Sequence, residues 1–354
     1  MAGDVHPGND PSRWDNLPQA AKFMVGELAQ AHTLGATRPT LPNAEHPAAL
    51  FLPLVFFHAE IFMTLSTPLS GVNRPLKGIL LIVTATFLFA SHDAFSKYLS
   101  GFYPIIMVVW ARYLVHTLLM AGIFLPQSGL RVLRSKRPLL QLVRALCLLG
   151  TSLFFTTGLL YIPLAEATAV NFLAPVLVTA LSVPLLGEHV TRGQWLAVIC
   201  GFIGVLIIVH PGGDLFTPAV LLPFCSAMFF CFYQLLTRKL SSIDSPTTSN
   251  FFAGLCNTLV MSALVPFFWQ VPTLWHGAMM LALGSCGMTA HLFLTQAFRH
   301  AAPALLAPFG YCQIVFAGLL GWLVFSHTPT STTILGIVII CLSGLAAAWQ
   351  QRRQ

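Results

Sequence analysis

Long apolar segments separated by short polar connections follow one another along this chain from residue 78 onward. Each segment has roughly 17 to 24 residues, which is enough for a helix to cross about 30 Å of hydrocarbon. The pattern predicts an all-α polytopic membrane protein with ten transmembrane helices, near residues 79–98, 103–125, 139–160, 163–186, 194–210, 217–237, 249–270, 277–297, 302–325 and 333–349.

The segments fall into two similar halves. Residues 188–191 (EHVT) correspond to 327–330 (HTPT) at a shift of 139, and the apolar segment 196–209 corresponds to 335–348 at the same shift. An earlier pair, 94–100 and 235–241, corresponds at a shift of 141. A duplication explains this self-similarity. Because five helices per copy is an odd number, the second copy must enter the membrane from the opposite side, which predicts two inverted five-helix repeats.

The repeats divide the chain into an extension at 1–72, a first repeat at 73–210 and a second at 211–354. The extension is rich in Pro, Gly, Asp, His and Asn, so we expect it to be disordered. Alternatively, it is translated upstream sequence and Met63 is the natural start. Residues 48–62 are apolar but short for a membrane span.

Lysines and arginines gather in alternate connections. The connections at 100–103, 211–216, 270–276 and 326–331 contain none. The basic residues at 74–77, 131–137, 192, 238–239, 299 and 352–353 all fall on the other side. By the positive-inside rule, we expect both ends of the ten-helix core to be cytoplasmic, in a bacterial inner membrane.

Composition agrees with a membrane protein, since 8% of residues are charged, 56% are hydrophobic and the mean hydropathy is +0.77. The net charge of +7 would suit nucleic acid. Because the basic residues lie beside apolar segments, topology explains the charge better, and we expect a lipid bilayer and a small-molecule substrate as partners. The eight cysteines are scattered singly with no CxxC pair, so neither a metal nor a cofactor is expected.

Charged side chains inside the apolar segments are the candidate site, because each is costly there and needs a partner, water or a route to the interface. Asp93 and Lys97 share a face of the first segment, and Arg112 and His116 share a face of the second. From the rise of about 1.5 Å per residue, Asp93, Arg112 and Glu166 are all expected in the outer half of the first repeat. Such a carboxylate–guanidinium–carboxylate cluster can hold a zwitterionic substrate.

The same charges have a structural interpretation as ion pairs that fix helix packing, or as side chains that reach the interface. We favour it for Lys97, and for Arg144, which is expected to reach the cytoplasmic surface. For Asp93, Arg112 and Glu166, both interpretations stay open.

The second half offers amides in place of acids. Gln234 stands where Asp93 stands in the first half, and Leu305 stands where Glu166 does. A site between the repeats would therefore have a charged wall and an amide-lined wall, to which we assign Gln313.

Asn171 and Trp110 complete the candidate site. Asn171 is an amide within an apolar segment, and Trp110 could stack on a planar ring, although aromatic residues at helical spacing more often serve packing. Pro175, in the same segment as Asn171, frees backbone groups and allows a bend.

Several motifs mark the duplicated unit: LYIPLAEA at 160–167 before a proline-containing helix, LGE at 186–188 at its end, and a glycine-rich fifth helix. Together they resemble EamA-type members of the drug/metabolite transporter superfamily over residues 78–349. DAFSKYL at 93–99 and VWARY at 109–113 are similar to a bacterial branch that includes proposed carriers of S-adenosylmethionine and riboflavin. The resemblance implies transport but not the substrate. One departure is His327, which stands where the first copy has Glu188.

We therefore expect a secondary transporter that moves a small polar organic metabolite, such as an amino acid, S-adenosylmethionine or riboflavin, by alternating access. Coupling to protons through Asp93 or Glu166 is one option. No GxxxxGK[ST] motif is present, so the chain itself is not expected to hydrolyse ATP. The alternative is a membrane-embedded transferase acting on a lipid-linked substrate, with His92 and Asp93 as an acid–base pair. Adjacent helical residues point about 100° apart, however, and we expect these two not to face each other.

Overall fold

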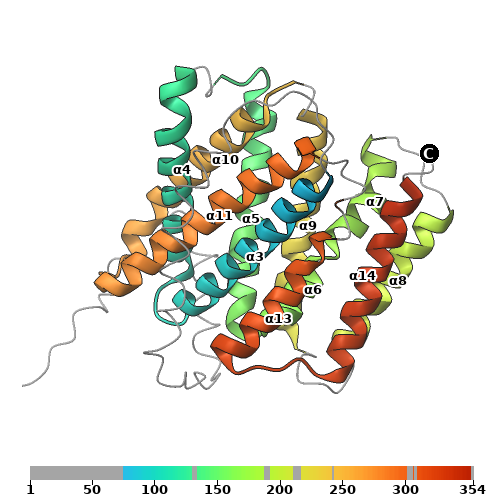
Figure 1. Cartoon of the computed structure of the whole chain (residues 1–354). Coiled ribbons are helices and arrows are strands. Elements are labelled where there is room, and N and C mark those ends of the chain that lie inside the picture. The colour runs from blue at the N-terminus through green and yellow to red at the C-terminus, as the bar shows by residue number, and fades with distance from the viewer. Residues whose placement is uncertain are drawn as a thin grey trace, which may run out of the picture. The chain divides into compact units, whose positions relative to one another are not determined.

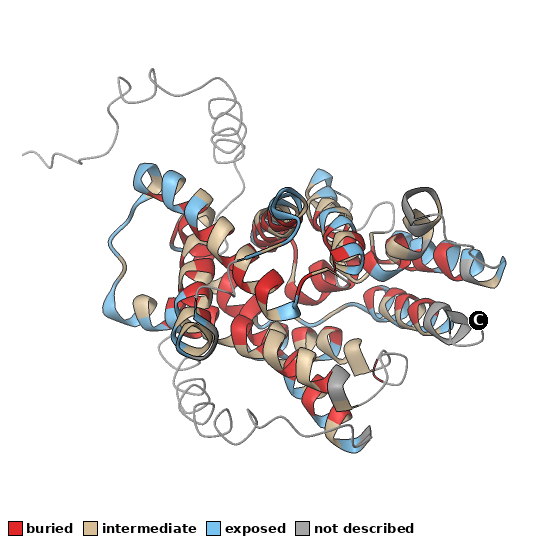
Figure 2. Cartoon of the chain, turned by 90° about the horizontal axis from the view of Figure 1, so that it is seen from above, coloured by how far each residue is buried: buried red, intermediate tan, exposed pale blue. Residues whose placement is uncertain are grey.

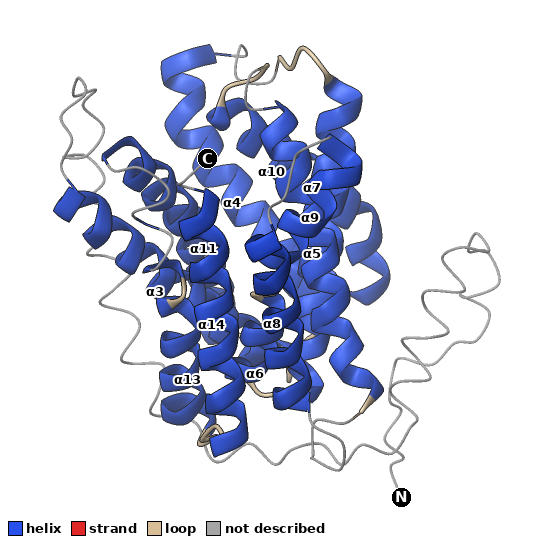
Figure 3. Ribbon diagram, turned by 90° about the vertical axis from the view of Figure 1, so that its right-hand side faces the viewer, coloured by secondary structure: helices blue, strands red, loops and turns tan. Residues whose placement is uncertain are grey.

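The computed structural model describes residues 75–129, 134–186, 192–209, 217–240, 243–300, 306 and 309–351. Within them every regular element is a helix, as Figure 3 shows, so the prediction of an all-α protein is confirmed for this part of the chain. The predicted extension 1–72, residues 187–188 of the LGE motif and the connection at 211–216 lie outside the described residues.

Figure 1 labels the helices in chain order. They are α3 (Pro75–Ser100), α4 (Ile105–Ser128), α5 (Pro138–Tyr161), α6 (Leu164–Asn171), α7 (Ala174–Leu186), α8 (Arg192–Val209), α9 (Leu221–Leu240), α10 (Pro246–Leu264), α11 (Leu274–His300), α13 (Cys312–Phe325) and α14 (Ser331–Gln351). Two short 3-10 turns, η4 (Pro218–Val220) and η5 (Val265–Phe268), precede α9 and follow α10.

Six helices are long and apolar enough to cross a membrane, namely α3, α4, α5, α9 with η4, α10 with η5, and α11. Shorter apolar helices overlap the remaining predicted segments: Leu164–Val178, Trp195–Val209, Cys312–Phe325 and Ser331–Ala346. The described chain is therefore a multi-span helical membrane protein.

The fourth predicted segment, 163–186, is not one continuous helix, because α6 ends at Asn171 and α7 begins at Ala174. Pro175 explains the break. It has no backbone N–H to donate, and its ring would clash with the carbonyl of Asn171 four residues earlier. The backbone N–H of Leu173 instead bonds to Val170 O at 3.0 Å, which tightens the end of α6.

Helices from early and late in the chain pack against each other (Figure 1). In the most extensive contacts, α3 lies against α11 and α13, α5 against α9, α4 against α10 and α11, and α8 against α14. The buried core is consequently shared between the two parts of the sequence that the duplication relates.

Figure 2 shows buried residues on the helix faces that meet and exposed residues on the faces that do not. Many exposed residues are large and apolar, such as Leu118 at 60%, Leu206 at 66% and Val315 at 68% exposure. In water such faces would be unfavourable, but on helices of this length they suit hydrocarbon.

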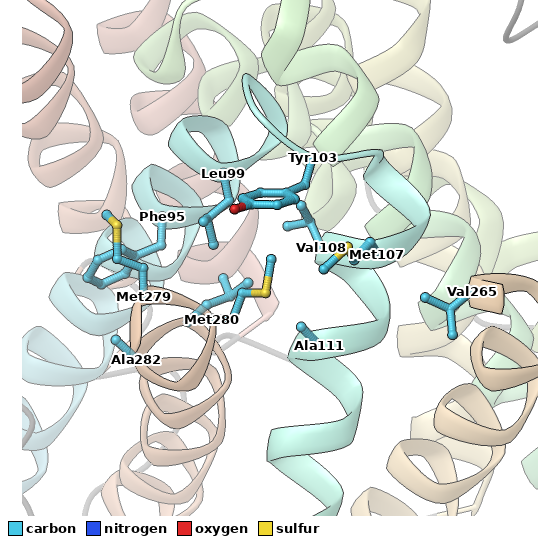
Figure 4. Close-up of a cluster of buried hydrophobic side chains, with 11 residues drawn as sticks. Phe95, Leu99, Tyr103, Met107, Val108, Ala111, Val265, Met279, Met280 and Ala282 are labelled. Atoms are coloured by element: carbon cyan, nitrogen blue, oxygen red, sulfur yellow. The ribbon is translucent and has the colours of Figure 1, made fainter. Parts of the chain in front are cut away.

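One buried apolar cluster fills the space between the end of α3 and the beginnings of α4 and α11 (Figure 4). We call it the apolar end cluster; it comprises Phe95, Leu99, Tyr103, Met107, Val108, Ala111, Val265, Met279, Met280, Ala282 and Leu283. The Tyr103 hydroxyl accepts a hydrogen bond from the Thr273 backbone N–H at 3.2 Å and lies 2.8 Å from His276 Nδ1. The connection after α3 is thereby fastened to the connection before α11.

Candidate functional site

A pocket lies between the middle parts of α4, α5, α9, α10 and α11. It is lined by Arg112, Tyr113, His116, Leu148, Tyr233, Asn250, Ala253, Gly254, Gly284, Gly287 and His291. None of these residues is acidic. The apolar end cluster lies next to the pocket, since Ala111 precedes Arg112 on α4 and Leu283 precedes Gly284 on α11.

Arg112 is the charged group of the pocket lining. Its Nη1 donates to Ser152 Oγ at 3.1 Å, and its guanidinium carbon lies 5.2 Å from the centre of the Tyr113 ring. The Tyr113 hydroxyl lies 2.7 Å from the same Ser152 oxygen. Tyr113 of α4 and Ser152 of α5 therefore both help to position Arg112. Among the described residues, Arg112 forms no ion pair.

Three histidines surround the same space. His116 and His291 line the pocket, with ring centres 6.1 Å apart in an edge-to-face arrangement. His92 lies behind Gly287, whose missing Cβ would stand 3.1 Å from the His92 ring. His92 is 3% exposed and its Nε2 has no hydrogen-bond partner among the described residues. Glycine at 287 is what allows α3 to bring this imidazole against the pocket wall.

Asp93 is held on both sides. One oxygen lies 3.0 Å from His92 Nδ1, and the other accepts a hydrogen bond from Gln313 Nε2 at 3.1 Å. Two predicted site residues, Asp93 and Gln313, are therefore brought together, from α3 and α13.

The expectation that His92 and Asp93 do not face each other is wrong. Both polar atoms lie close to the backbone on short side chains, so suitable rotamers overcome the angle between neighbouring helical positions. The side chains are nearly buried, at 4% for His92 and 11% for Asp93.

Glu166 lies elsewhere, in the first turn of α6. It is 2% exposed, its Oε1 lies 3.3 Å from Nε2 of His327, and its Oε2 has no hydrogen-bond partner among the described residues. The predicted cluster of Asp93, Arg112 and Glu166 is consequently not assembled: the first faces α13, the second faces α5, and the third faces the connection after α13.

Lys97 has structural partners, but they are backbone carbonyls and not the acid of an ion pair. Its Nζ donates to the backbone oxygens of Leu159 and of Ile162, the latter at 2.8 Å, and lies 5.6 Å from the centre of the Phe325 ring. These carbonyls stand at the end of α5, where the helix itself supplies no donors. Lys97 therefore caps α5.

Arg144 does not reach the surface, contrary to expectation, because it is 1% exposed on α5. Its guanidinium donates to Thr237 Oγ1 at 2.6 Å, to Ser249 O at 2.9 Å and to the Tyr233 hydroxyl at 2.8 Å. It also lies 3.5 Å from Asn250 Oδ1. All these acceptors are neutral, and the described residues give Arg144 no ion pair.

Asp244, in the connection before α10, fastens that connection to the start of α5. It accepts hydrogen bonds from Ser135 Oγ at 2.5 Å, from the Lys136 backbone N–H at 3.0 Å and from Gln141 Nε2 at 2.9 Å. Desolvation alone would raise the pKa of the carboxyl. These bonds, together with the charge of Lys136, outweigh that effect and hold the pKa of Asp244 below its usual value.

Trp110 and Asn171 have other partners. Trp110 Nε1 donates to Ser262 Oγ at 2.9 Å, and its ring meets Trp269 edge to face at 5.7 Å. Asn171 Oδ1 accepts a hydrogen bond from Ser226 at 2.9 Å. Neither lines the pocket. The pocket also contains Tyr233 of α9 and Asn250 of α10, which were not among the predicted site residues. They were missed because neither carries a charge that distinguishes it in the sequence.

Comparison with known families gives one match that covers most of the chain. The model of the EamA-like transporter family matches residues 76–210 and again residues 217–347.

Curated relatives are transporters from bacteria. An S-adenosylmethionine uptake transporter of Rickettsia prowazekii is 25% identical, over 78% of this chain and 94% of that protein. A riboflavin transporter of Vibrio cholerae is 31% identical, over 79% and 96%. A pseudopaline exporter of Pseudomonas aeruginosa is 30% identical, over 76% and 95%. A crystal structure with 20% sequence identity superimposes with a TM-score of 0.57, over 80% of this chain and 100% of the other, which shows a shared fold.

Proposed function

Because this chain belongs to the EamA-like transporter family, we propose that it is a secondary transporter that moves a small polar organic metabolite through the central pocket. The relatives are named for S-adenosylmethionine, riboflavin and pseudopaline, and they support a small organic metabolite as the substrate. The observation that carries the proposal is that helices from both family-matched parts of the chain line the pocket. Helices α4 and α5 belong to the first family match and α9, α10 and α11 to the second, so the pocket lies between the two matched parts.

The proposed architecture is ten membrane crossings in two inverted repeats, 73–210 and 211–354, in a bacterial inner membrane. The double family match supports the repeats. Two contacts support the orientation. Tyr103 meets His276 across two connections that lack Lys and Arg, and Lys136 meets Asp244 across two that are expected to face the cytoplasm.

Alternating access requires contacts that close each end of the pocket in turn. The contact of Glu166 with His327 and the apolar end cluster join the two repeats at the proposed outer end. The hydrogen bonds of Asp244 with Ser135 and Gln141 join them at the proposed inner end. Opening one end while the other stays closed would expose the pocket to one side at a time.

Glu166 is the proposed proton carrier, because it is buried with one oxygen unpartnered among the described residues and stands where the outer end would open. Lys97 and His327 are the titratable groups that interact with Glu166 from neighbouring elements. Uptake into proteoliposomes with an imposed pH gradient tests this coupling. The rate should follow the gradient in the wild type and not in Glu166→Gln; a wild-type rate that ignores the gradient would sink the idea.

Transport itself is tested by loading proteoliposomes with the full chain and offering S-adenosylmethionine, riboflavin, riboflavin 5′-phosphate, succinate and amino acids, each labelled. Uptake above that of empty liposomes should be lost in Arg112→Gln. It should persist in Arg137→Gln, an exposed arginine outside the pocket. If no compound moves faster than through empty liposomes, the proposed function fails.

The alternative of a membrane-embedded transferase gains nothing from these relatives, which are named as transporters. The contact of His92 with Asp93 is the feature such an enzyme could use, but Asp93 is also engaged by Gln313. A carrier is therefore favoured over an enzyme.

A further inference from the structure

Two guanidinium groups stand at the central pocket, and no described acid forms an ion pair with either of them. Arg112 is part of the lining, and Arg144 stands directly behind the wall made by Tyr233 and Asn250, to which it donates. Neither forms an ion pair among the described residues. The pocket is thus bordered by two positive charges that come from α4 and α5.

Asp93 and Asp244 already have hydrogen-bond partners of their own. Asp93 is held by His92 and Gln313, and Asp244 receives its hydrogen bonds from the start of α5. Gln141 stands between Asp244 and Arg144, since its amide nitrogen donates to the first and its oxygen accepts from the second at 3.4 Å. The carboxylate is therefore coupled to Arg144 only through a neutral amide.

The remaining polar groups of the wall suit an acceptor-rich ligand. His116 and His291 line the pocket from α4 and α11, and a neutral imidazole can donate from one ring nitrogen. His92 is not counted among these donors, because its Nδ1 faces the Asp93 carboxylate and its neutral ring would then leave Nε2 as an acceptor. Donors from α4 and α11 thus converge on the space beside Arg112.

An uncompensated cation in a low-dielectric interior is costly, and an anion bound beside it removes much of that cost. Guanidinium groups also match the planar, two-oxygen geometry of carboxylate and phosphate better than an ammonium does. The pocket is consequently more favourable for an oxyanion than for a neutral or cationic group.

We infer that the central pocket is selective for a small organic anion, a carboxylate or phosphate ester, that Arg112 binds. Arg144 is a positioning residue that fixes the Tyr233 hydroxyl and the Asn250 amide and adds positive potential. This inference rests on the proposed function, because it names the substrate class of the same site.

An anion-selective pocket would differ in its substrate from the two relatives that are named for S-adenosylmethionine and riboflavin. S-adenosylmethionine carries a net positive charge at neutral pH, and riboflavin carries none, whereas riboflavin 5′-phosphate is the same ring system with an anionic group. The charge of the pocket should therefore favour the phosphate ester over riboflavin, and succinate over its uncharged diamide.

The test is thermal unfolding of the purified full chain with four probes at equal concentration: succinate, succinamide, riboflavin 5′-phosphate and riboflavin. A ligand that binds the native state raises the melting temperature. We expect a rise with at least one anion and none with its uncharged counterpart. Arg112→Gln should weaken the apparent affinity for that anion by about 10- to 100-fold, as expected for a charge-assisted hydrogen bond. The carboxylate and phosphate arms identify which oxyanion is taken.

An equal rise with the uncharged member of a pair, or no rise with either anion, would overturn the inference. The proteoliposome experiment distinguishes failure of the anion selectivity from failure of the proposed transport function. If proteoliposomes carry an uncharged or cationic metabolite, the transporter proposal stands and the anion selectivity falls; if they carry nothing, the proposed function falls as well.

Tyr233→Phe tests whether Arg144 positions the pocket wall or only stabilises the fold. The substitution keeps the ring whose centre lies 4.5 Å from the Arg144 guanidinium carbon and removes only the hydroxyl that accepts a hydrogen bond from Arg144. We expect KM for the anion to rise several-fold with the melting temperature of the ligand-free protein nearly unchanged. An unchanged KM would show that Arg144 serves only to hold the helices together.

Discussion

The carboxylate of Asp93 on α3 accepts a hydrogen bond from the side-chain amide of Gln313 on α13 at 3.1 Å, across a separation of 220 residues. The bond joins the two family-matched parts of the chain, and its acceptor belongs to a nearly buried side chain. The same carboxylate lies 3.0 Å from His92, whose ring borders the pocket wall at Gly287. The pair therefore connects the packing of α3 against α13 to the pocket.

Removing the amide should be costly. Gln313→Leu leaves one oxygen of a nearly buried carboxylate without its donor, which costs about 1–3 kcal/mol, and more where the group is charged. The measurement is thermal unfolding in detergent. Gln296→Leu, a half-buried glutamine on α11, is the matched control and should shift the melting temperature less. Equal shifts in the two variants would contradict a specific role for the bond.

Lys97→Met should destabilise the protein without changing substrate affinity, because it removes the donor of the Leu159 and Ile162 carbonyls at the end of α5. Leaving these acceptors unsatisfied costs about 1–3 kcal/mol. Lys97→Arg retains donors and serves as the control. A rise in KM in Lys97→Met at unchanged stability would instead place Lys97 in substrate binding.

Asp244 makes stability depend on acid. Because its pKa in the folded protein lies below the unfolded value of about 3.9, its contribution is fully present above that value. The contribution is lost as the pH falls from about 3.9 through the lower pKa of the folded state. Asp244→Asn should lower stability at neutral pH, and the difference from the wild type should shrink as the pH falls through this range. Unfolding curves at neutral and acid pH measure the difference, and a gap that stays constant would argue against the lowered pKa.

The contact of α8 with α14 should tolerate no side chain at Gly204. A Cβ there would lie 3.0 Å from the backbone oxygen of Gly336 and 2.8 Å from Ile340 Cγ1. Gly204→Ala is therefore expected to destabilise by about 1–3 kcal/mol through overpacking. Gly318→Ala is the control, since its nearest neighbour would be 3.9 Å away, and its melting temperature should stay near the wild-type value. Equal destabilisation by both would contradict the close approach.

Apolar length predicted where the helices lie but not all of their ends. Each of the ten predicted segments overlaps a described helix, but the segment 163–186 was predicted as one helix, and the structure divides it after Asn171 because of Pro175. Close packing at Gly201 and Gly204 follows from glycine in an apolar helix, whereas Gly318 and Gly321 have no neighbour within 3.4 Å of a Cβ and are not used in this way.

Side-chain partners could not be predicted from the same pattern. Helical periodicity places Asp93 and Lys97 on one face of α3 but does not say which helix that face meets. The structure sends Asp93 to α13 and Lys97 to the end of α5. Arg144 was misjudged for the same reason, because its acceptors at Tyr233 and Ser249 lie 89 and 105 residues further along the chain.

A pocket that serves as the transport site must be reached from each side of the membrane in turn. The most direct measurement is thiol labelling of Ala253→Cys, a pocket-lining position, in a chain whose eight native cysteines are replaced by serine and whose transport is retained. A membrane-impermeant reagent should label the introduced cysteine when it is added to either face of the vesicle. If the positive pocket attracts an anionic reagent, labelling by that reagent should be slower in Arg112→Gln. Labelling from one face only, or from neither, would contradict alternating access to this pocket.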